Sequence, residues 1–528
     1  MKNLTATSNG SWLTLVILAA MLLAACGGSQ EAPVVVHPGA QAGDLVGLEP
    51  CTYEARDVEY AADCGTLVVP ENRSDPDSRL IALPVTRVLA TDDDPAEPVF
   101  RLNGGPGISN MNWPAVAWLI EKHDVVLVGY RGVDGTVRLD CPEVSQHIRN
   151  LPGDILSEES LAGWSDAYAA CASRLQSEGV DIDGYTVVEV VDDLEDARLA
   201  LGFEQINLYS GSYGTRLAMI YAWRYPESIY RSAMVGVNPP GRMYYYDPAV
   251  VDAQLEYYSE LCTANAECSA RTDNLAETIR SVYRDAPERW LGLPIDVDMS
   301  RVASFESLSA VGEAPLVFDV WLAAGEGDYS GMVLLTLGGS FLFAEATVWG
   351  DNVAKAASAD LEDTQALRDE MNLSKSIMGT PRTELVTAAE GWPANTIPAE
   401  YRQVQPSDVE TLLVSGNIDM WTPAQYAEEE LLPFLSNGQH VVLSESGHGE
   451  MRRRQPEAAA HLLNTFYDTG VGDDSMFVYK PWEFKVGLGF PLMAKLGLAI
   501  VALVVVGLVV LVRYVVRRVR RRRAAQAT

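Results

Sequence analysis

The chain has 528 residues, of which 72 are Asp or Glu and 39 are Lys or Arg, and its net charge is −33. Lys2 and the seven arginines of residues 513–528 contribute eight positive charges, so residues 3–512 carry a net charge of −41. Nucleic acid is therefore excluded as an expected partner, and we interpret the acidic residues as a solvated surface. The length suits one large domain with an insertion, together with targeting segments.

The N-terminus has the pattern of a bacterial lipoprotein signal peptide over residues 1–25. Lys2 precedes an apolar run from Trp12 to Ala25, and Cys26 follows in the sequence LAACG. Cys26 would then be the acylated first residue of the mature protein. An ordinary cleaved signal peptide and an uncleaved anchor are the alternatives, and all three place the following residues outside the cytoplasm. Residues 26–47 are expected to form a flexible tether.

The first part of the folded region shows strands that alternate with helices. Its four β-type runs are CGTLVVPENR, LIALPVTRVLA, EPVFRLNGG and HDVVLVGYRG. The last two are short, apolar and bounded by glycines, as buried parallel strands are. Helices are predicted over 158–175 and 189–201, and another β run near 231–237. This alternation predicts a parallel sheet with helices on both faces, in which ligands bind beyond the carboxyl ends of the strands.

Residues 205–224, QINLYSGSYGTRLAMIYAWR, join a short β run to an amphipathic helix through a turn of small residues. Ser212 lies in this turn, with Ser210 and Gly214 two residues to either side, close to the GxSxG pattern of a nucleophile elbow. The helix begins directly behind the serine, so its positive end would favour an oxyanion there. An ordinary Gly/Ser turn is the alternative. Ser210 stands where glycine is usual, and a side chain there could strain the turn.

The NGGPG loop at residues 103–107 follows the strand that ends at Leu102, so it is expected at the same edge of the sheet. Its glycines would let the backbone approach a ligand closely. A loop N–H could then be a second oxyanion donor beside the N–H of Tyr213. A plain Gly/Pro turn is the alternative.

The alternation stops from about Pro239 to Gln405, where 250–266, 274–286, 315–325 and 364–372 are predicted to be helices. We therefore predict an inserted helical cap over 239–405, between two parts of the core at 48–238 and 406–470. The core resumes with the run TLLVSGNIDMWTP, a helix from Pro423, the β run HVVLSES and a closing helix at 456–468.

A serine nucleophile needs a base, and the base needs an orienting acid. Of the six histidines, His448 follows a β run in the small-residue loop SGHG, just before a helix. Asp419 follows the strand LLVSG in GNIDMWTP. The alternatives are a loop histidine without a role and an aspartate that caps a helix. The order Ser212, Asp419, His448 is the chain order of α/β-hydrolases.

The pieces RLNGGPG, YRG, LYSGSYGTRLA, GNIDMWTP and SGHG together resemble the α/β-hydrolase peptidases of the proline iminopeptidase and tripeptidyl aminopeptidase type. The resemblance covers about residues 48–470. It implies an α/β-hydrolase fold with a helical cap that restricts access to peptide ends. It implies these roles: Ser212 as nucleophile, His448 as base, Asp419 as orienting acid, and Gly105 and Tyr213 as oxyanion donors. Asn103, where proline iminopeptidases usually have His, and Ser210 leave the substrate open.

An exopeptidase that releases N-terminal residues must neutralise a buried ammonium, so carboxylates in the cap are required. Glu345 and Asp351, in FAEATVWGD, are the candidates. The leading hypothesis is a membrane-tethered serine aminopeptidase acting on short peptides through an acyl-enzyme, on the periplasmic or outer side of a bacterial membrane. An esterase or amidase acting on small molecules is the first alternative, and a non-catalytic binding protein is the second.

The C-terminus carries a second membrane signal. Leu496 to Val512 are 17 residues without a charge, at the short end of what spans a bilayer, and seven arginines follow within 513–528. The positive-inside rule places these arginines in the cytoplasm and the preceding domain outside. We therefore predict a stalk at 471–487, a transmembrane helix at 488–512 and a basic cytoplasmic tail at 513–528.

Cysteine usage agrees with export. Six cysteines remain besides Cys26, an even number in a compartment where disulfides persist. Neighbours in the sequence suggest the pairs Cys51–Cys64, Cys141–Cys171 and Cys262–Cys268, although fifteen pairings are formally possible. No CxxC or His/Cys cluster indicates a metal site, and we expect no cofactor.

Overall fold

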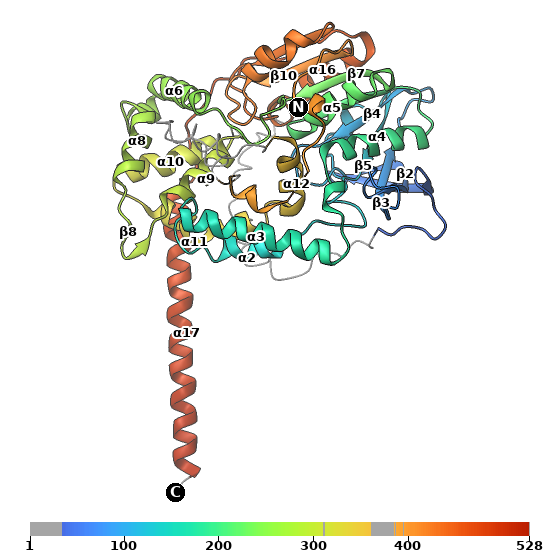
Figure 1. Cartoon of the computed structure of the whole chain (residues 1–528). Helices are drawn as coiled ribbons and strands as arrows, with labels where there is room; N and C mark the ends of the chain where they lie inside the picture. Colours follow the sequence, from blue (N-terminus) through green and yellow to red (C-terminus); the bar gives the residue numbers. More distant parts are fainter. Residues whose placement is uncertain (1–33, 310–311, 361–384, 386, 394, 527–528) are drawn as a thin grey trace, which may run out of the picture.

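A computed structural model of the chain describes residues 34–526 except 310–311, 361–384, 386 and 394. Its centre is a nine-stranded sheet with the strand order β1-β2-β3-β5-β4-β6-β7-β10-β11 (Figure 1). The strands are β1 (Leu45–Ala55), β2 (Val58–Pro70), β3 (Leu80–Val88), β4 (Ala96–Leu102), β5 (His123–Val128), β6 (Ile206–Gly211), β7 (Ile229–Val235), β10 (Glu410–Gly416) and β11 (Gly438–Leu443).

The sheet is antiparallel at its N-terminal side and parallel over the rest. β1, β2, β3 and β5 pair antiparallel with one another in turn, and all pairs from β5 through β4, β6, β7 and β10 to β11 are parallel. The carboxyl ends of β4, β6, β7, β10 and β11 therefore meet at one edge. That edge collects the loops that carry the predicted site residues.

Two hydrophobic cores lie on the two faces of the sheet. Along β5, Val126 and Val128 belong to one core, while Val125 and Leu127 belong to the other, as the alternation of side chains along a strand requires. The helices of this part are α2 (Pro142–Arg149), α3 (Glu158–Ser177), α4 (Val187–Ala200), α5 (Tyr213–Arg224), α15 (Met451–Arg454) and α16 (Pro456–Thr469). α4 and α5 pack on the first core and α16 on the second, so the sheet has helices on both faces.

A mostly helical region lies between β7 and β10 in the sequence and beside the sheet in space (Figure 1). Its helices are α6 (Pro248–Ala264), α7 (Ala266–Ser269), α8 (Leu275–Asp285), α9 (Val297–Leu308), α10 (Ala314–Gly325), α11 (Ser330–Ala344) and α12 (Trp349–Ala359), with the short hairpin β8 (Arg289–Trp290) and β9 (Leu293–Pro294). We call this region the cap. The helix predicted at 364–372 lies outside the described residues.

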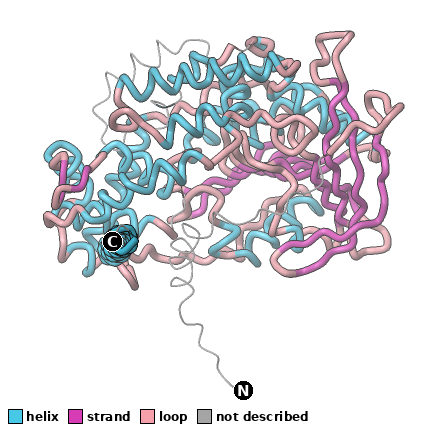
Figure 2. Tube along the Cα trace, turned by 90° about the horizontal axis from the view of Figure 1, so that it is seen from below, coloured by secondary structure: helices cyan, strands magenta, loops and turns pink. Residues whose placement is uncertain are grey.

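The chain ends in the long helix α17 (Phe490–Gln526), which projects from the cap side of the molecule. Figure 2 shows α17 end-on beside cap helices, on the side away from the N-terminal strands. Its stretch Phe490–Val519 is long and apolar enough to cross a membrane. The preceding segment was predicted to be a stalk, but it packs on the cap. The rings of Trp482 and Phe484 lie 5.8 and 5.9 Å from those of Tyr258 and Phe318, because both are large apolar groups.

Two other expectations differ from the structure. The tether was expected to reach residue 47, but β1 begins at Leu45, and Gly43 N already donates to Val68 O at 2.8 Å, because this stretch pairs with β2. A helix was expected from Pro423, and residues 424–434 are helical, but mainly as a π-helix (Tyr426–Leu431) that continues into a short 3₁₀ turn (Leu432–Phe434). Residues 1–33, with Cys26, lie outside the described residues.

Three disulfides join cysteines that are neighbours in the sequence, namely Cys51–Cys64, Cys141–Cys171 and Cys262–Cys268. The first connects β1 to β2, the second connects the start of α2 to α3, and the third closes the turn between α6 and α7. Each disulfide thus fastens elements that are adjacent in the fold.

Candidate active site

Ser212 lies in the turn between β6 and α5, in a backbone conformation that side-chain-bearing residues rarely adopt. Its φ is 54° and its ψ is −124°. The turn is held because Ser212 N donates to Val235 O at 2.9 Å and Thr215 Oγ1 donates to Ser212 O at 2.6 Å. A strained residue at a strand-to-helix turn is the geometry of a nucleophile elbow.

Two small residues near Ser212, Gly214 and Ser210, can be explained by their contacts. A Cβ added to Gly214 would lie 2.2 Å from Leu102 O, so α5 could not pack this closely on β4 with any other residue. Ser210, which the sequence suggested might strain the turn, is fully buried and donates its hydroxyl to Ala233 O on β7 at 3.2 Å. The serine at this position therefore adds a hydrogen bond between neighbouring strands.

Asp419 and His448 follow β10 and β11 and are hydrogen-bonded to each other. Asp419 Oδ2 lies 2.8 Å from His448 Nδ1 and accepts the Thr422 hydroxyl at 2.7 Å, and Asp419 Oδ1 accepts the N–H groups of Trp421 and Thr422, both at 2.9 Å. The Asp419 side chain is 1% exposed and the His448 side chain 15%. The network places the imidazole proton on Nδ1. His448 Nε2 has no hydrogen-bond partner among the described residues, Ser212 included, and is the basic nitrogen.

The end of β7 lies against both Ser212 and His448. Val235 O accepts the Ser212 N–H, and a Cβ added to the next residue, Gly236, would lie 3.1 Å from His448 Cε1 and 2.7 Å from Thr422 Oγ1. The hydroxyl and the imidazole therefore lie on either side of one strand end. Hydrogen bonds between such groups are often long before substrate binds.

The NGGPG loop lies against the other side of Ser212. A Cβ added to Gly104 would be 3.1 Å from Ser212 Cβ, and Gly105 has a φ of 136°, which favours glycine. Neither the N–H of Gly105 nor that of Tyr213 donates a hydrogen bond to another described residue. Both amides thus lack an acceptor among the described residues, and Tyr213 N lies at the positive end of α5.

A network of hydrogen bonds, partly buried, holds the NGGPG loop in its conformation. Asn103 Oδ1 accepts the Arg101 guanidinium at 2.5 Å, Asn103 Nδ2 donates to Ser109 O at 2.7 Å, and Asn103 N donates to Asn110 Oδ1 at 2.9 Å. Burial lowers the pKa of Arg101 to about 10, so the group stays charged at neutral pH. Asn103 therefore supports the loop's conformation.

Asp351, a predicted ligand for a substrate ammonium, lies beneath the same loop. Its Oδ2 accepts Gly107 N at 2.9 Å and its Oδ1 binds Lys355 Nζ, which also donates to Arg131 O at 3.2 Å. Asp351 and Lys355 are both fully buried. Burial raises the pKa of the Asp351 carboxyl and lowers the pKa of the Lys355 amine, while the contact between them opposes both shifts. Asp351 therefore supports the loop, and both of its oxygens are occupied.

Glu345, the other predicted ammonium ligand, lies on the surface. Its side chain is 62% exposed and forms an ion pair with Arg149. It lines an open cleft whose other walls include Gly107, Ile108 and Trp349. The structure thus does not bring Glu345 and Asp351 together.

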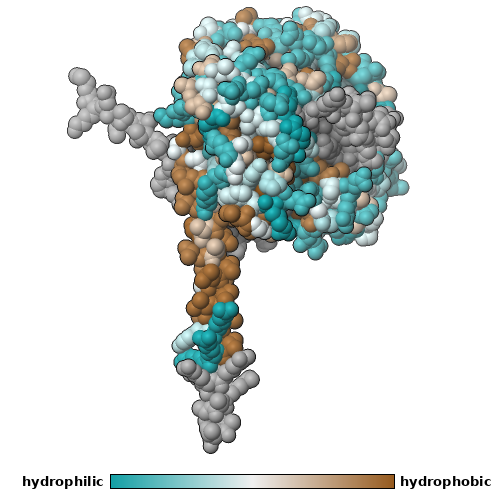
Figure 3. Space-filling view, turned by 90° about the vertical axis from the view of Figure 1, so that its left-hand side faces the viewer, coloured by the Kyte–Doolittle hydropathy of each residue, from teal (hydrophilic) through white to brown (hydrophobic). Residues whose placement is uncertain are grey.

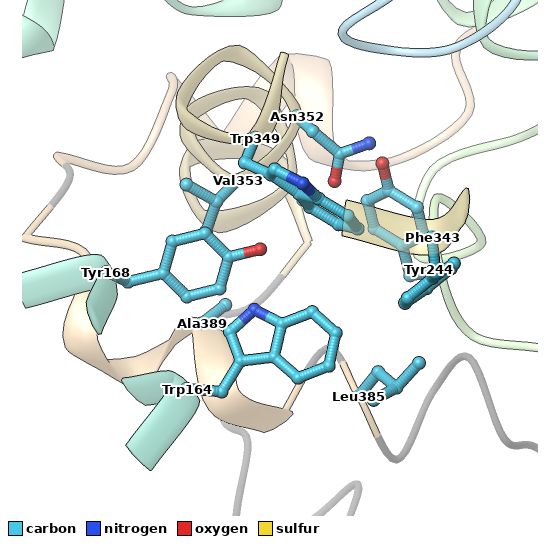
Figure 4. Close-up of a pocket in the computed structure, with 10 residues that line it drawn as sticks. Trp164, Tyr168, Tyr244, Phe343, Trp349, Asn352, Val353, Leu385 and Ala389 are labelled. Carbon is cyan, nitrogen blue, oxygen red and sulfur yellow. The ribbon is translucent and has the colours of Figure 1, made fainter. Parts of the chain in front are cut away.

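An aromatic cavity lies beside α12, which contributes Trp349, Asn352 and Val353 to its wall (Figure 4). Asn352 connects it to the loop, because Asn352 lines the cavity and its Nδ2 donates to Pro106 O at 3.1 Å. No charged residue is among the described residues that line it, which are Trp164, Tyr168, Tyr244, Phe343, Trp349, Asn352, Val353, Ala356, Leu385 and Ala389. The described lining of the cavity is therefore uncharged and mostly aromatic.

Comparison with known families agrees with this architecture. Residues 97–278, which include β4 to β7 and Ser212, match a family described as "alpha/beta hydrolase fold". The chain has the α/β-hydrolase fold. Residues 375–475 of this α/β-hydrolase, which include Asp419 and His448, match a second family described as "TAP-like protein".

The α/β-hydrolase is also similar to three individual proteins. The tripeptidyl aminopeptidase of Streptomyces lividans is 24% identical over 360 residues, which are 63% of this chain and 61% of that protein. Serine protease Hip1 of Mycobacterium tuberculosis is 26% identical over 256 residues, covering 44% of this chain and 48% of Hip1. The putative hydrolase YuaR of Escherichia coli is 31% identical over 189 residues, 33% of this chain and 36% of YuaR. The matches thus span less than two thirds of each relative.

Several residues of this α/β-hydrolase site were not predicted. Thr422 contacts both Asp419 and His448, and the local sequence DMWTP carried a signal for it, since a Thr three residues after an Asp can bond to that carboxylate. Lys355 is four residues after Asp351 on α12, a spacing that places both on one helix face. Arg101 and Asn110 gave no signal, because their contacts depend on how the loop folds back on β4.

Proposed function

We propose that the chain is a serine peptidase that releases N-terminal residues from short peptides through an acyl-enzyme formed on Ser212. One observation carries the proposal. Asp419 and His448 share a hydrogen bond of 2.8 Å, and His448 lies against the end of β7, which also contacts the strained Ser212. The names of the similar Streptomyces and Mycobacterium proteins supply the peptidase part of the proposal.

In this mechanism Ser212 Oγ attacks the scissile carbonyl while His448 Nε2 accepts its proton. Asp419 keeps the imidazole in the tautomer that leaves Nε2 free and stabilises the imidazolium that forms. Thr422 assists by donating to Asp419 Oδ2. His448 then returns the proton to the leaving amine, and a water molecule hydrolyses the ester in the second half of the cycle.

The N–H groups of Gly105 and Tyr213 bind the negative oxygen of the tetrahedral intermediate in this proposal. Their support is that both are unused by the described residues, that Tyr213 directly follows Ser212, and that Gly104, next to Gly105, lies against the Ser212 side chain. Fixed amides at the end of a helix stabilise an oxyanion without reorganising during the reaction.

The release of N-terminal residues is supported by the relatives' names and by the cap, which lies over one side of the site through α12. The two predicted carboxylates do not support it. Both oxygens of Asp351 are already bonded to Gly107 N and Lys355 Nζ, and Glu345 is exposed. The membrane anchor is supported by α17, whose apolar stretch is followed by arginines, so that the catalytic region lies outside and residues 513–528 in the cytoplasm. We also propose that the cap spans 239–405, between the two parts of the core.

The test uses the full-length chain in detergent with short peptides whose N-termini are free or acetylated. We expect product from the free peptides and little from the acetylated ones. Ser212→Ala should lose the activity and the labelling of the protein by a fluorophosphonate probe. Labelling that persists in Ser212→Ala would show that Ser212 is not the nucleophile.

A second candidate is an esterase or amidase acting on neutral small molecules. The aromatic cavity beside the loop favours it, because the described residues that line the cavity include no carboxylate for an ammonium. The same assay decides between the two. Equal rates with free and acetylated peptides, together with a strong preference for simple esters, would support the esterase.

A further inference from the structure

Helix α11 of the cap has one face directed into the protein and one face of exposed apolar side chains. Its sequence, SGMVLLTLGGSFLFA, contains no charged residue. Leu337, Phe341 and Leu342 are 43%, 60% and 58% exposed. Isolated apolar residues on a surface are ordinary, but an uncharged helix with such a face indicates a site of interaction.

The inward face of α11 is fixed, so the exposed side chains cannot turn inward. Thr336 Oγ1 accepts Asp296 N at 2.8 Å, and Gly339 lies against Met299. Near the end of the helix, the Phe343 ring packs edge-on at 5.4 Å from the Trp349 ring, at the aromatic cavity. The apolar outer face is therefore a stable property of the folded cap.

The start of α11 is attached to the start of α17. Ser330 Oγ donates to Pro491 O at 3.1 Å, and a Cβ added to Gly331 would lie 3.3 Å from the Phe490 ring. Just before α11, Asp328 pairs with Lys495 at 2.5 Å. The first turns of α17 thus belong to the cap, and their position sets the position of α11 relative to the rest of α17.

The uncharged part of α17 begins directly after the turns that are bound to the cap. The 17 uncharged residues from Leu496 to Val512 cover about 26 Å at 1.5 Å per residue, and the stretch that can cross a membrane continues to Val519. Because no linker separates this stretch from Lys495, which pairs with the cap, the cap lies close to the lipid headgroups. Hydrophobic side chains also gather on the body where α17 leaves it (Figure 3). Leu488, just before α17, and Leu492, in its first turn, are 45% and 50% exposed.

We propose that the exposed face of α11 lies in the interfacial region of the same bilayer that α17 crosses. The inference rests on the membrane anchor proposed above. The partner is a phospholipid bilayer, because the face is uncharged, apolar and continuous with a helix built for that environment. The aromatic cavity, to which α11 contributes Phe343, would then lie near the membrane surface.

The test places a fluorescent probe on α11 in the full-length protein, reconstituted in nanodiscs of phosphatidylethanolamine and phosphatidylglycerol. Phe341→Cys is labelled with a polarity-sensitive nitrobenzoxadiazole group in a Cys26→Ser background, since the other six cysteines form disulfides. Leu199→Cys is the matched control, because Leu199 is 59% exposed and its helix, α4, lies away from α17 (Figure 1). Val505→Cys reports on the membrane span itself.

We expect emission from residue 341 at shorter wavelength than from residue 199, and loss of intensity at 341 but not at 199 when lipids with a spin label near the headgroup are included. Lipids with a spin label near the end of the acyl chain test residue 505. Quenching at 505 by these lipids, without quenching at 341 by the headgroup-labelled lipids, would overturn this inference and leave the membrane anchor intact. No quenching at 505 by the chain-end label would overturn the anchor as well. A probe at 341 that is shielded but not quenched by lipid would show that protein covers α11, which also contradicts the proposal.

Discussion

Asp419 and Asp351 are two buried aspartates that support different loops beside Ser212. They differ in the groups that they contact, and this difference decides what each can do in a reaction. Asp419 Oδ2 faces the imidazole of His448, a group that can change its charge during a reaction. Asp351 contacts Gly107 N and Lys355 Nζ, and neither group takes part in the proposed reaction. Burial alone therefore does not identify a functional carboxylate. The partner decides whether the carboxylate contributes to catalysis or to the stability of the fold.

The largest effect is expected from Asp419→Asn. The amide cannot stabilise the imidazolium, and it favours the tautomer in which Nε2 carries the proton, so we expect kcat to fall about 10⁴-fold. The rate of peptide release, measured with an N-terminally free peptide, checks this. The midpoint of chemical unfolding is the control, because the effect should be on the reaction. A kcat within tenfold of the unaltered protein would contradict the role assigned to Asp419.

Lys355→Met tests the other aspartate, and its effect should be on stability. The substitution leaves the Asp351 carboxylate buried without a cation, and we expect a loss of about 3–5 kcal/mol in the free energy of unfolding at neutral pH. The loss should be smaller at pH 5 than at pH 8. A carboxyl whose folded pKa lies above its unfolded pKa binds more protons in the folded state, so stability falls as pH rises.

The control for Lys355→Met is the double variant Asp351→Asn, Lys355→Met, which removes both charges. It should recover most of the lost stability and should show little dependence on pH. If the double variant is as unstable as Lys355→Met, the methionine itself disturbs the packing of α12. The interpretation of Asp351 as a structural partner of Lys355 would then be wrong.

The difference between the two aspartates also explains what the sequence could predict. Strands that end in small-residue loops identified the edge of the sheet, because parallel strands place their carboxyl ends together. The structure has Ser212, Asp419 and His448 in the loops one, three and five residues after the ends of β6, β10 and β11. The alternation of strands and helices likewise predicted the fold, and the family match over residues 97–278 confirms it.

The contacts made by the cap could not be predicted as well as the edge of the sheet. Helices were expected there, but which of their faces is buried depends on contacts between distant segments. Asp351 and Gly107 are 244 residues apart, and no local pattern shows that they meet. Glu345 and Asp351, six residues apart, received the same interpretation, although one is exposed and the other is fully buried. The start of β1 was misplaced for a similar reason, since its pairing with β2 extends a strand into a segment whose composition resembles a linker.

Glu345→Gln should have the smallest effect and completes the comparison with a carboxylate that is not buried. Its partner Arg149 is also solvent-exposed, so water and salt screen the pair, and the free energy of unfolding should change by less than about 0.5 kcal/mol. KM for a peptide with a free N-terminus should change less than about twofold, the range expected when a screened surface charge is removed. The measurement compares free and acetylated peptides in the same variant. A large rise in KM for the free peptide alone would show that Glu345 binds the substrate ammonium, and the open cleft beside Gly107 would then be the path of the peptide N-terminus.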